Sequence, residues 1–118
     1  MTHLLIRAET WLAVMLLTVP ALTLAGAANA EDATISITLK DHKFTPDEIR
    51  VPAGKAVVLK IKNEDTSAEE FESHPLKIEK VIAAGKEGTV RLSPQKPGRY
   101  PFVGEYHEGT AKGVVIVE

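Results

Sequence analysis

Cysteine is absent from all 118 residues of the chain. This absence excludes a disulfide framework, a thiolate nucleophile, a cysteine zinc site and any copper centre that depends on a cysteine thiolate. Methionine and tryptophan are also scarce. The two methionines, Met1 and Met15, and the one tryptophan, Trp11, all lie near the N-terminus. Any metal site in the rest of the chain must therefore be built from histidine and carboxylate side chains.

The chain also lacks a large excess of either charge. It has 14 basic and 16 acidic side chains, a formal net charge of -2 and a pI near 6.1. Domains that bind nucleic acid usually carry a basic patch and a high pI, so we expect no nucleic acid partner. The content of 44% hydrophobic and 25% charged residues is that of an ordinary globular domain.

The N-terminal segment has the composition of an export signal. Residues 11–25 are almost entirely apolar, and Ala28-Asn29-Ala30 provides the small-residue pattern that signal peptidase reads. We predict a signal peptide over residues 1–30, cleaved after Ala30, and an exported, periplasmic domain over residues 31–118. The alternative is an uncleaved membrane anchor, but the apolar run of 15 residues is shorter than the ~20 that a spanning helix needs.

Hydrophobic residues in the rest of the chain recur with a period near two, which predicts β-strands. The first run alternates through Ile35, Ile37 and Leu39, and segments rich in Pro, Gly, Asn and Asp separate it from later runs. Short strands at this spacing predict an all-β domain with a β-sandwich architecture. A short turn is expected only around residues 66–70. The predicted strands are residues 34–39, 56–61, 76–82, 88–92, 98–103 and 112–117.

Two stretches of the sequence resemble the two halves of a cupredoxin. The first is Phe44-x-Pro46-x-x-Ile49-x-Val51-x-x-Gly54, followed by Val57-x-Leu59-x-Ile61-x-Asn63. The second is Gly98-x-Tyr100-x-Phe102, followed by His107 and residues 112–117. The resemblance covers nearly all of residues 31–118 and implies a single Greek-key β-sandwich with a copper site between loops at one end.

The closing half departs from the electron-carrier cupredoxins at the ligand positions. In those proteins the closing loop supplies a cysteine, a histidine and usually a methionine. The corresponding positions here are Gly104, His107 and, approximately, Ala111. Without a thiolate an intense blue charge-transfer site is excluded, so the electron-carrier function of the fold is not expected.

A narrower resemblance lies in Glu70-Phe71-Glu72 and in Tyr106-His107-Glu108. These segments are similar to those of the cupredoxin-like periplasmic proteins of bacterial ferrous-iron uptake, the EfeO/FtrB type. Members of this group lack the blue-copper cysteine and work beside an iron permease that accepts trivalent iron. The resemblance implies a periplasmic copper-binding protein that oxidises ferrous iron for uptake by a membrane iron permease.

The acidic segment can contribute ligands from one strand face. If residues 70–74 are extended, alternation places Glu70, Glu72 and His74 on one face and directs Phe71 to the core. Alternate residues are about 6.6 Å apart, which is too far for all three to bind one small ion unaided. The loop at residues 104–109 can complete the site, because glycines at both ends let it curl.

Imidazole and carboxylate ligands suit divalent copper, iron, manganese or zinc, and copper leads in the general affinity order. We therefore expect a copper site beside a more carboxylate-rich iron site, with iron as the substrate. The candidate ligands are His107, His42 and Glu70 for copper, Glu72, Glu105 and Glu108 for iron, and His74 for either site or neither.

In this hypothesis copper accepts one electron from ferrous iron, and a membrane or periplasmic electron acceptor then reoxidises the copper. Two other functions stay open. One is binding or delivery of copper or iron without redox turnover, and the other is a metal-free β-sandwich that binds another protein, in which the acidic residues form a solvated strand edge. A monomer and a dimer are both compatible with the sequence.

Overall fold

The structure is a computed structural model, and it describes residue 13, residue 18 and residues 32–118. The predicted cleavage site after Ala30, and all but two residues of the predicted signal peptide, lie outside the described residues. Glu31–Glu118 form one compact unit. No helix in the described part of the chain is long and apolar enough to span a membrane.

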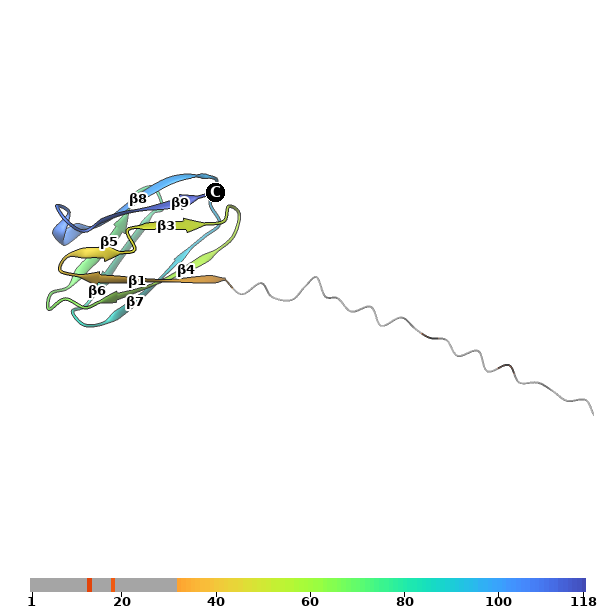
Figure 1. Ribbon diagram of the computed structural model, residues 1–118, viewed down its shortest axis with the longest axis horizontal. Helices are drawn as coiled ribbons and strands as arrows, with labels where there is room; N and C mark the ends of the chain where they lie inside the picture. The colour runs from red at the N-terminus through yellow and green to blue at the C-terminus, as the bar shows by residue number, and fades with distance from the viewer. Residues whose placement is uncertain (1–12, 14–17, 19–31) are drawn as a thin grey trace, which may run out of the picture. The chain divides into compact units, whose positions relative to one another are not determined.

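The described residues fold into strands joined by short loops, with a single turn of 3-10 helix (Figure 1). The predicted all-β class is confirmed, and each of the six predicted strands overlaps an observed one. Two further strands, at residues 43–45 and 48–51, were not predicted, and the strand at residues 69–73 was considered only conditionally, over residues 70–74. The elements are β1 (Ala33–Lys40), β2 (Lys43–Thr45), β3 (Glu48–Val51), β4 (Val57–Asn63), β5 (Glu69–Ser73), β6 (Ile78–Ile82), β7 (Glu87–Leu92), β8 (Gly98–Gly104), η1 (Glu105–His107) and β9 (Lys112–Val117).

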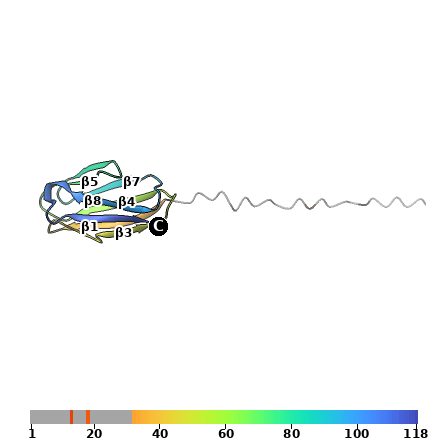
Figure 2. The same cartoon turned by 90° about the horizontal axis from the view of Figure 1, so that it is seen from above.

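The strands form two sheets packed face to face (Figure 2). One sheet has the order β2-β1-β4-β7 and the other has the order β3-β9-β8-β5-β6. β1 pairs parallel with β4, and β3 pairs parallel with β9, while the other strand pairs are antiparallel. Several neighbouring strands, such as β3 and β9, are distant in sequence. The architecture is the predicted cupredoxin-like β-sandwich.

The core lies between the two sheets and follows from the alternation of side chains. In β4 the side chains of Val57, Leu59 and Ile61 are fully buried, whereas the residues between them face outward. Phe44, Phe71 and Phe102 form a cluster in which ring centroids are 4.8–5.8 Å apart, the range of favourable aromatic pairs. The expected core position of Phe71 is confirmed.

The segment before β5 differs from the predicted turn. The strand already begins at Glu69, and the loop that precedes it is held by the buried side chain of Asn63. The amide nitrogen of Asn63 donates to the carbonyl oxygens of Ser67 (2.9 Å) and Ile82 (3.1 Å), and its oxygen accepts the backbone N–H of Asp65 (2.9 Å). These bonds replace the backbone bonds that a helical turn would supply.

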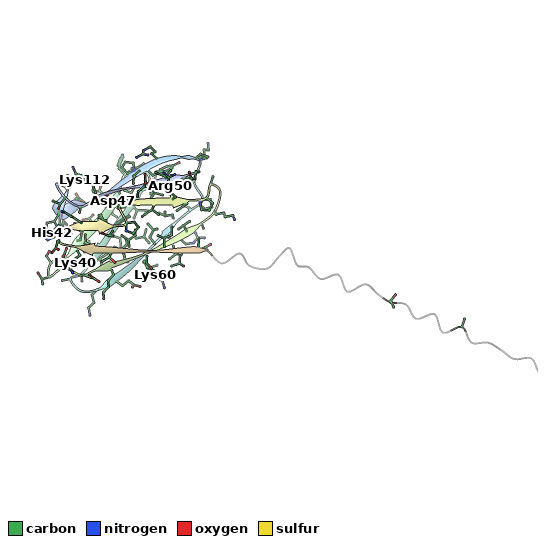
Figure 3. The ribbon with its side chains drawn as sticks, viewed as in Figure 1. Lys40, His42, Asp47, Arg50, Lys60 and Lys112 are labelled. Carbon is green, nitrogen blue, oxygen red and sulfur yellow. The ribbon has the colours of Figure 1, made fainter. Side chains whose placement is uncertain are left out.

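One end of the sandwich, opposite the C-terminus, brings together segments from distant parts of the chain. The turn between β1 and β2, the loop before β5 and the 3-10 helix η1 all lie there (Figure 1). Figure 3 shows His42 at this end, close to Lys40. Three of the candidate ligands, His42, Glu105 and His107, lie in these segments.

Candidate metal site

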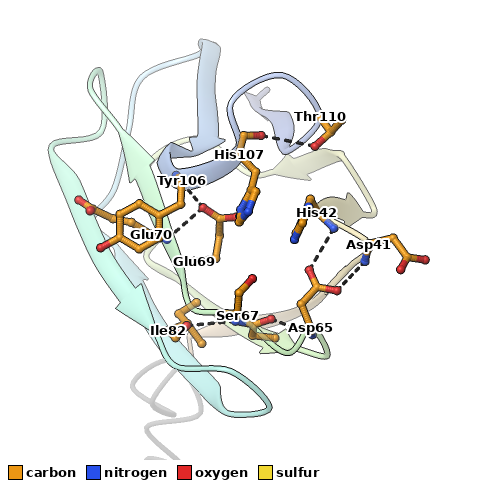
Figure 4. Close-up of polar contacts among 11 residues, drawn as sticks. Asp41, His42, Asp65, Ser67, Glu69, Glu70, Ile82, Tyr106, His107 and Thr110 are labelled. Atoms are coloured by element: carbon orange, nitrogen blue, oxygen red, sulfur yellow. Dashed lines mark hydrogen bonds and ion pairs between the residues drawn. The ribbon is translucent and has the colours of Figure 1, made fainter.

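A buried carboxylate in contact with an imidazole forms the centre of the site (Figure 4). Glu69, at the start of β5, is only 2% exposed, and its Oε2 lies 2.5 Å from Nδ1 of His107. Its other oxygen, Oε1, accepts the backbone N–H groups of Tyr106 (2.9 Å) and Glu70 (3.1 Å). One proton lies in this contact, because one of the two atoms, Nδ1 or Oε2, must donate to the other.

Gly104, the last residue of β8, makes room for this carboxylate. A Cβ atom at position 104 would lie 2.6 Å from Cδ of Glu69 and 2.7 Å from Cβ of Ala111. Any larger side chain, including that of a cysteine, would therefore collide with Glu69. The sequence has no cysteine at position 104, and the structure has no space there for a cysteine side chain.

His42 lies directly over His107. The two imidazole rings are stacked, with centroids 3.5 Å apart and an angle of 10° between their planes (Figure 4). The nitrogen lone pairs of an imidazole lie in the plane of the ring, so stacked rings direct their lone pairs side by side rather than toward a common point. One ring must tilt before both can bind the same ion.

Three carboxylates gather beside this centre. One oxygen each from Glu70 on β5, Glu79 on β6 and Glu105 on η1 lie within 4.8 Å of one another. Loss of hydration raises the pKa of Glu70, and the nearby charge of Glu105 raises it further. The pKa of Glu105 is raised mainly by its hydrogen bond with Glu72 and by the charge of that residue.

Tyr106 connects the Glu69–His107 pair with the carboxylate cluster. The backbone N–H of Tyr106 donates to Glu69, and its phenol contacts Glu70. Partial loss of hydration and the negative charge of Glu70 raise the pKa of Tyr106, so the phenol stays neutral at neutral pH.

The structure separates the remaining candidates from the Glu69–His107 pair. His74 is exposed in the turn between β5 and β6, and Glu108 follows η1. In the described residues neither side chain hydrogen-bonds to Glu69 or His107. His74 and Glu72 line an open pocket of about 390 Å³, and together with Glu108 they also line a smaller one of about 260 Å³.

The carboxylate on His107 belongs to Glu69, whereas the sequence led us to expect Glu70. Alternation along β5 is the reason: Glu69, Phe71 and Ser73 face inward and are buried, while Glu70 and Glu72 are half-buried on the outer face. The same alternation that predicts a core position for Phe71 also places Glu69 inside. A buried carboxylate requires partners. The signal available in the sequence was the position of Glu69 on the inward face that also carries Phe71.

The family model of the cupredoxin-like domain matches residues 12–117. This chain belongs to the cupredoxin-like domain family. An uncharacterized protein of Rickettsia prowazekii (strain Madrid E) is 43% identical over 83 residues, which cover 70% of this chain and 66% of the relative. The chain thus spans slightly less than two thirds of the length of that relative.

Solved cupredoxin structures share the fold. The metal binding domain of the Cu(I) exporting P-type ATPase CopA of Streptococcus pneumoniae D39, solved with Cu(I), matches with a TM-score of 0.65 and 22% identity, covering 72% of this chain and 84% of that one. Auracyanin A, a "blue" copper protein from the green thermophilic photosynthetic bacterium Chloroflexus aurantiacus, has a TM-score of 0.64 and 16% identity, covering 74% and 99%. At these identities the likeness establishes the fold.

Proposed function

We propose that this protein is an exported metal-binding protein that holds copper at Glu69, His42 and His107 and oxidises ferrous iron. The iron is held as substrate by neighbouring carboxylates and passes as ferric iron to a membrane iron permease. The observation that carries the proposal is the buried Glu69–His107 contact beneath the His42 ring.

The donor set fits divalent copper. Nδ1 of His107 and Oε2 of Glu69 face each other across one proton, and a divalent metal ion can replace that proton, because metal binding deprotonates its ligands. Two imidazoles and one carboxylate are nitrogen and oxygen donors that suit Cu(II). The three residues provide no sulfur, the donor that Cu(I) prefers.

Glu70, Glu79 and Glu105 suit the iron substrate. Their oxygen atoms lie close together. Loss of hydration and the charge of Glu105 raise the pKa of Glu70, and Glu72 with the charge of Glu79 raises the pKa of Glu105, so repulsion between carboxylates contributes to both. A bound cation would relieve that repulsion. Hard oxygen donors favour the higher charge of Fe(III), which lowers the reduction potential of the iron and promotes its oxidation.

The two groups of ligands share a strand. Glu69 and Glu70 are consecutive, and the backbone N–H of Glu70 donates to Oε1 of Glu69, so a short covalent path joins the two sites. Copper held at the first site would supply a one-electron acceptor, reduced from Cu(II) to Cu(I) as Fe(II) becomes Fe(III) and then reoxidised by a membrane or periplasmic redox protein. Glu70, Glu79 and Glu105 would bind the iron, and the hydrogen bond from the backbone N–H of Glu70 to Glu69 holds the two groups of ligands side by side.

Anaerobic mixing of the two metals tests the proposal. The protein is loaded with one equivalent of Cu(II) and mixed with Fe(II), while electron paramagnetic resonance follows copper and a ferric-specific assay follows iron. We expect the copper signal to disappear with the formation of one ferric ion per copper. A Glu105→Gln variant should bind copper normally and react more slowly, since it loses an iron ligand only.

Two results would overturn the redox proposal. Tight copper binding with a persistent Cu(II) signal would identify a metal carrier without redox turnover. Failure to bind copper specifically would favour a β-sandwich that binds another protein.

A further inference from the structure

We infer that Asp65 is a positioning residue that keeps the ring of His42 beside His107, so that the tilt needed to share an ion starts from a neighbouring ring. The inference rests on the proposed copper site and adds a residue that hydrogen-bonds to the backbone N–H of His42 rather than to its ring. Asp65 lies in the loop between β4 and β5, and it is 23 residues away from His42 in sequence.

The turn that carries His42 has an unusual backbone. Lys40 of β1 pairs with Lys43 of β2, so Asp41 and His42 alone form the turn. Both have positive φ angles, 51° for Asp41 and 56° for His42. A two-residue hairpin turn with positive φ at both positions is normally formed by Asn-Gly or Asp-Gly, and histidine adopts this conformation much less readily than glycine.

The Asp65 carboxylate supports this turn from outside the hairpin. One oxygen, Oδ1, accepts the backbone N–H of Asp41 at 2.7 Å, and the other, Oδ2, accepts the backbone N–H of His42 at 3.0 Å (Figure 4). A charged acceptor strengthens both hydrogen bonds. The contact therefore stabilises the left-handed conformation that directs the His42 side chain toward His107.

Asp65 is itself held from the core. Its backbone N–H donates to the side-chain oxygen of Asn63, which is completely buried at the end of β4. The amide nitrogen of Asn63 donates to carbonyl oxygens of Ser67 and of Ile82 on β6. A continuous set of hydrogen bonds thus runs from the core through Asn63 and Asp65 to the backbone of His42.

The ring of His42 depends on this backbone support. Within residues 32–118 the His42 side chain makes no hydrogen bond, and its ring contact is the stack with His107. The direction of the ring is therefore determined by the turn and by stacking. Without Asp65 the turn loses the acceptor for both of its N–H groups, and His42 would no longer be held at the site.

An Asp65→Ala variant tests the inference, with Glu64→Ala as its matched control. Glu64 is the exposed neighbour of Asp65, so its substitution removes the same charge from the same loop. In the metal-free protein, NMR should detect a ring-to-ring nuclear Overhauser effect between His42 and His107 in the native chain and in Glu64→Ala, but not in Asp65→Ala. This readout needs no metal.

The same variants are then titrated with Cu(II). We expect Asp65→Ala to bind copper about 10- to 100-fold more weakly, the loss that follows removal of a group that orients a metal ligand. The nitrogen hyperfine pattern of bound Cu(II) should change from two imidazoles to one. A purely structural role would lower the melting temperature and leave this pattern unchanged.

If the alanine variant does not fold, Asp65→Asn replaces it in the test, because the asparagine side-chain oxygen still accepts the backbone N–H of either Asp41 or His42. It should show a weakened ring-to-ring signal and an intermediate copper affinity. Persistence of the full signal and of the two-imidazole pattern without the Asp65 carboxylate would overturn the inference. If His42→Ala binds copper as tightly as the native chain while Asp65→Ala loses the ring contact, the proposed copper site fails and the positioning role of Asp65 is supported.

Discussion

The carboxylate of Glu69 occupies the space that a side chain on Gly104 would need. The separation of 2.6 Å between a Cβ at position 104 and Cδ of Glu69 is shorter than any normal contact between carbon atoms. The two positions are therefore coupled: the chain can keep an inward carboxylate on β5 or a side chain at the end of β8, but not both without rearrangement.

A Gly104→Ala substitution should therefore destabilise the protein. The added methyl group must displace either Glu69 or Ala111, and overpacking of this kind costs about 1–3 kcal/mol. Urea unfolding measures the change. In a Glu69→Ala background the same substitution should cost less, and an equal cost in both backgrounds would contradict the coupling.

Copper binding should release a proton. In the metal-free structure Nδ1 of His107 and Oε2 of Glu69 share a hydrogen bond, and a metal ion that uses these atoms must displace its proton. Calorimetric titration in buffers of different ionisation enthalpy measures the number of protons released. We expect a positive release at neutral pH and a copper affinity that rises with pH, and no release would place copper elsewhere.

His42 and His74 should respond differently to substitution. His42→Ala removes a proposed ligand, so Cu(II) affinity should fall by about 100-fold or more, since loss of a group that merely orients a ligand already costs about 10- to 100-fold. His74→Ala is the matched control, because His74 is exposed in the turn after β5. Equal affinities of the two variants would exclude His42 from the site.

The metal-free protein should become less stable as the pH rises above about 4.5. The folded-state pKa values of Glu70 and Glu105 are raised above their ordinary value of 4.5, so the folded state binds more protons than the unfolded state in this window. The stabilisation is complete below pH 4.5 and is lost as the pH rises through the raised values.

Thermal unfolding of Glu105→Gln tests this pH dependence. The variant should have a flatter profile of melting temperature against pH than the native chain, because one member of the repelling cluster is neutral at every pH. An exposed carboxylate elsewhere, replaced in Glu64→Gln, provides the control. If the two variants have the same profile, repulsion around Glu105 does not govern the dependence.

The sequence predicted the long strands well and the short ones poorly. The six predicted strands are long enough to show either alternating or continuous apolar residues, whereas β2 has three residues and β3 has four. β5 was expected only conditionally, because three of its five residues are glutamates, a residue that is depleted in strands. Local sequence patterns thus lose their power where an element is short or where its packing overrides its propensity.

The site was predicted in outline. His107 was identified because it stands at a retained ligand position, and the structure places His42 against it. Glu69 was not among the expected ligands, although alternation places it on the same strand face as Phe71, and its burial depends on the space left by Gly104. The contacts of Asp65 with Asp41 and His42 join segments more than twenty residues apart, so a local sequence pattern cannot predict them.

Three residues of the site, on three different segments, each lie two positions in sequence from a phenylalanine of the aromatic cluster. His42 precedes Phe44, Glu69 precedes Phe71, and Gly104 follows Phe102, and the three phenylalanines contact one another. The strands that carry Glu69 and Gly104 therefore rest on the same aromatic cluster, and we expect them to open together. Amide hydrogen exchange at β5 and at the end of β8 should proceed through the same cooperative opening, so that the lifetime of the site equals the lifetime of the aromatic core.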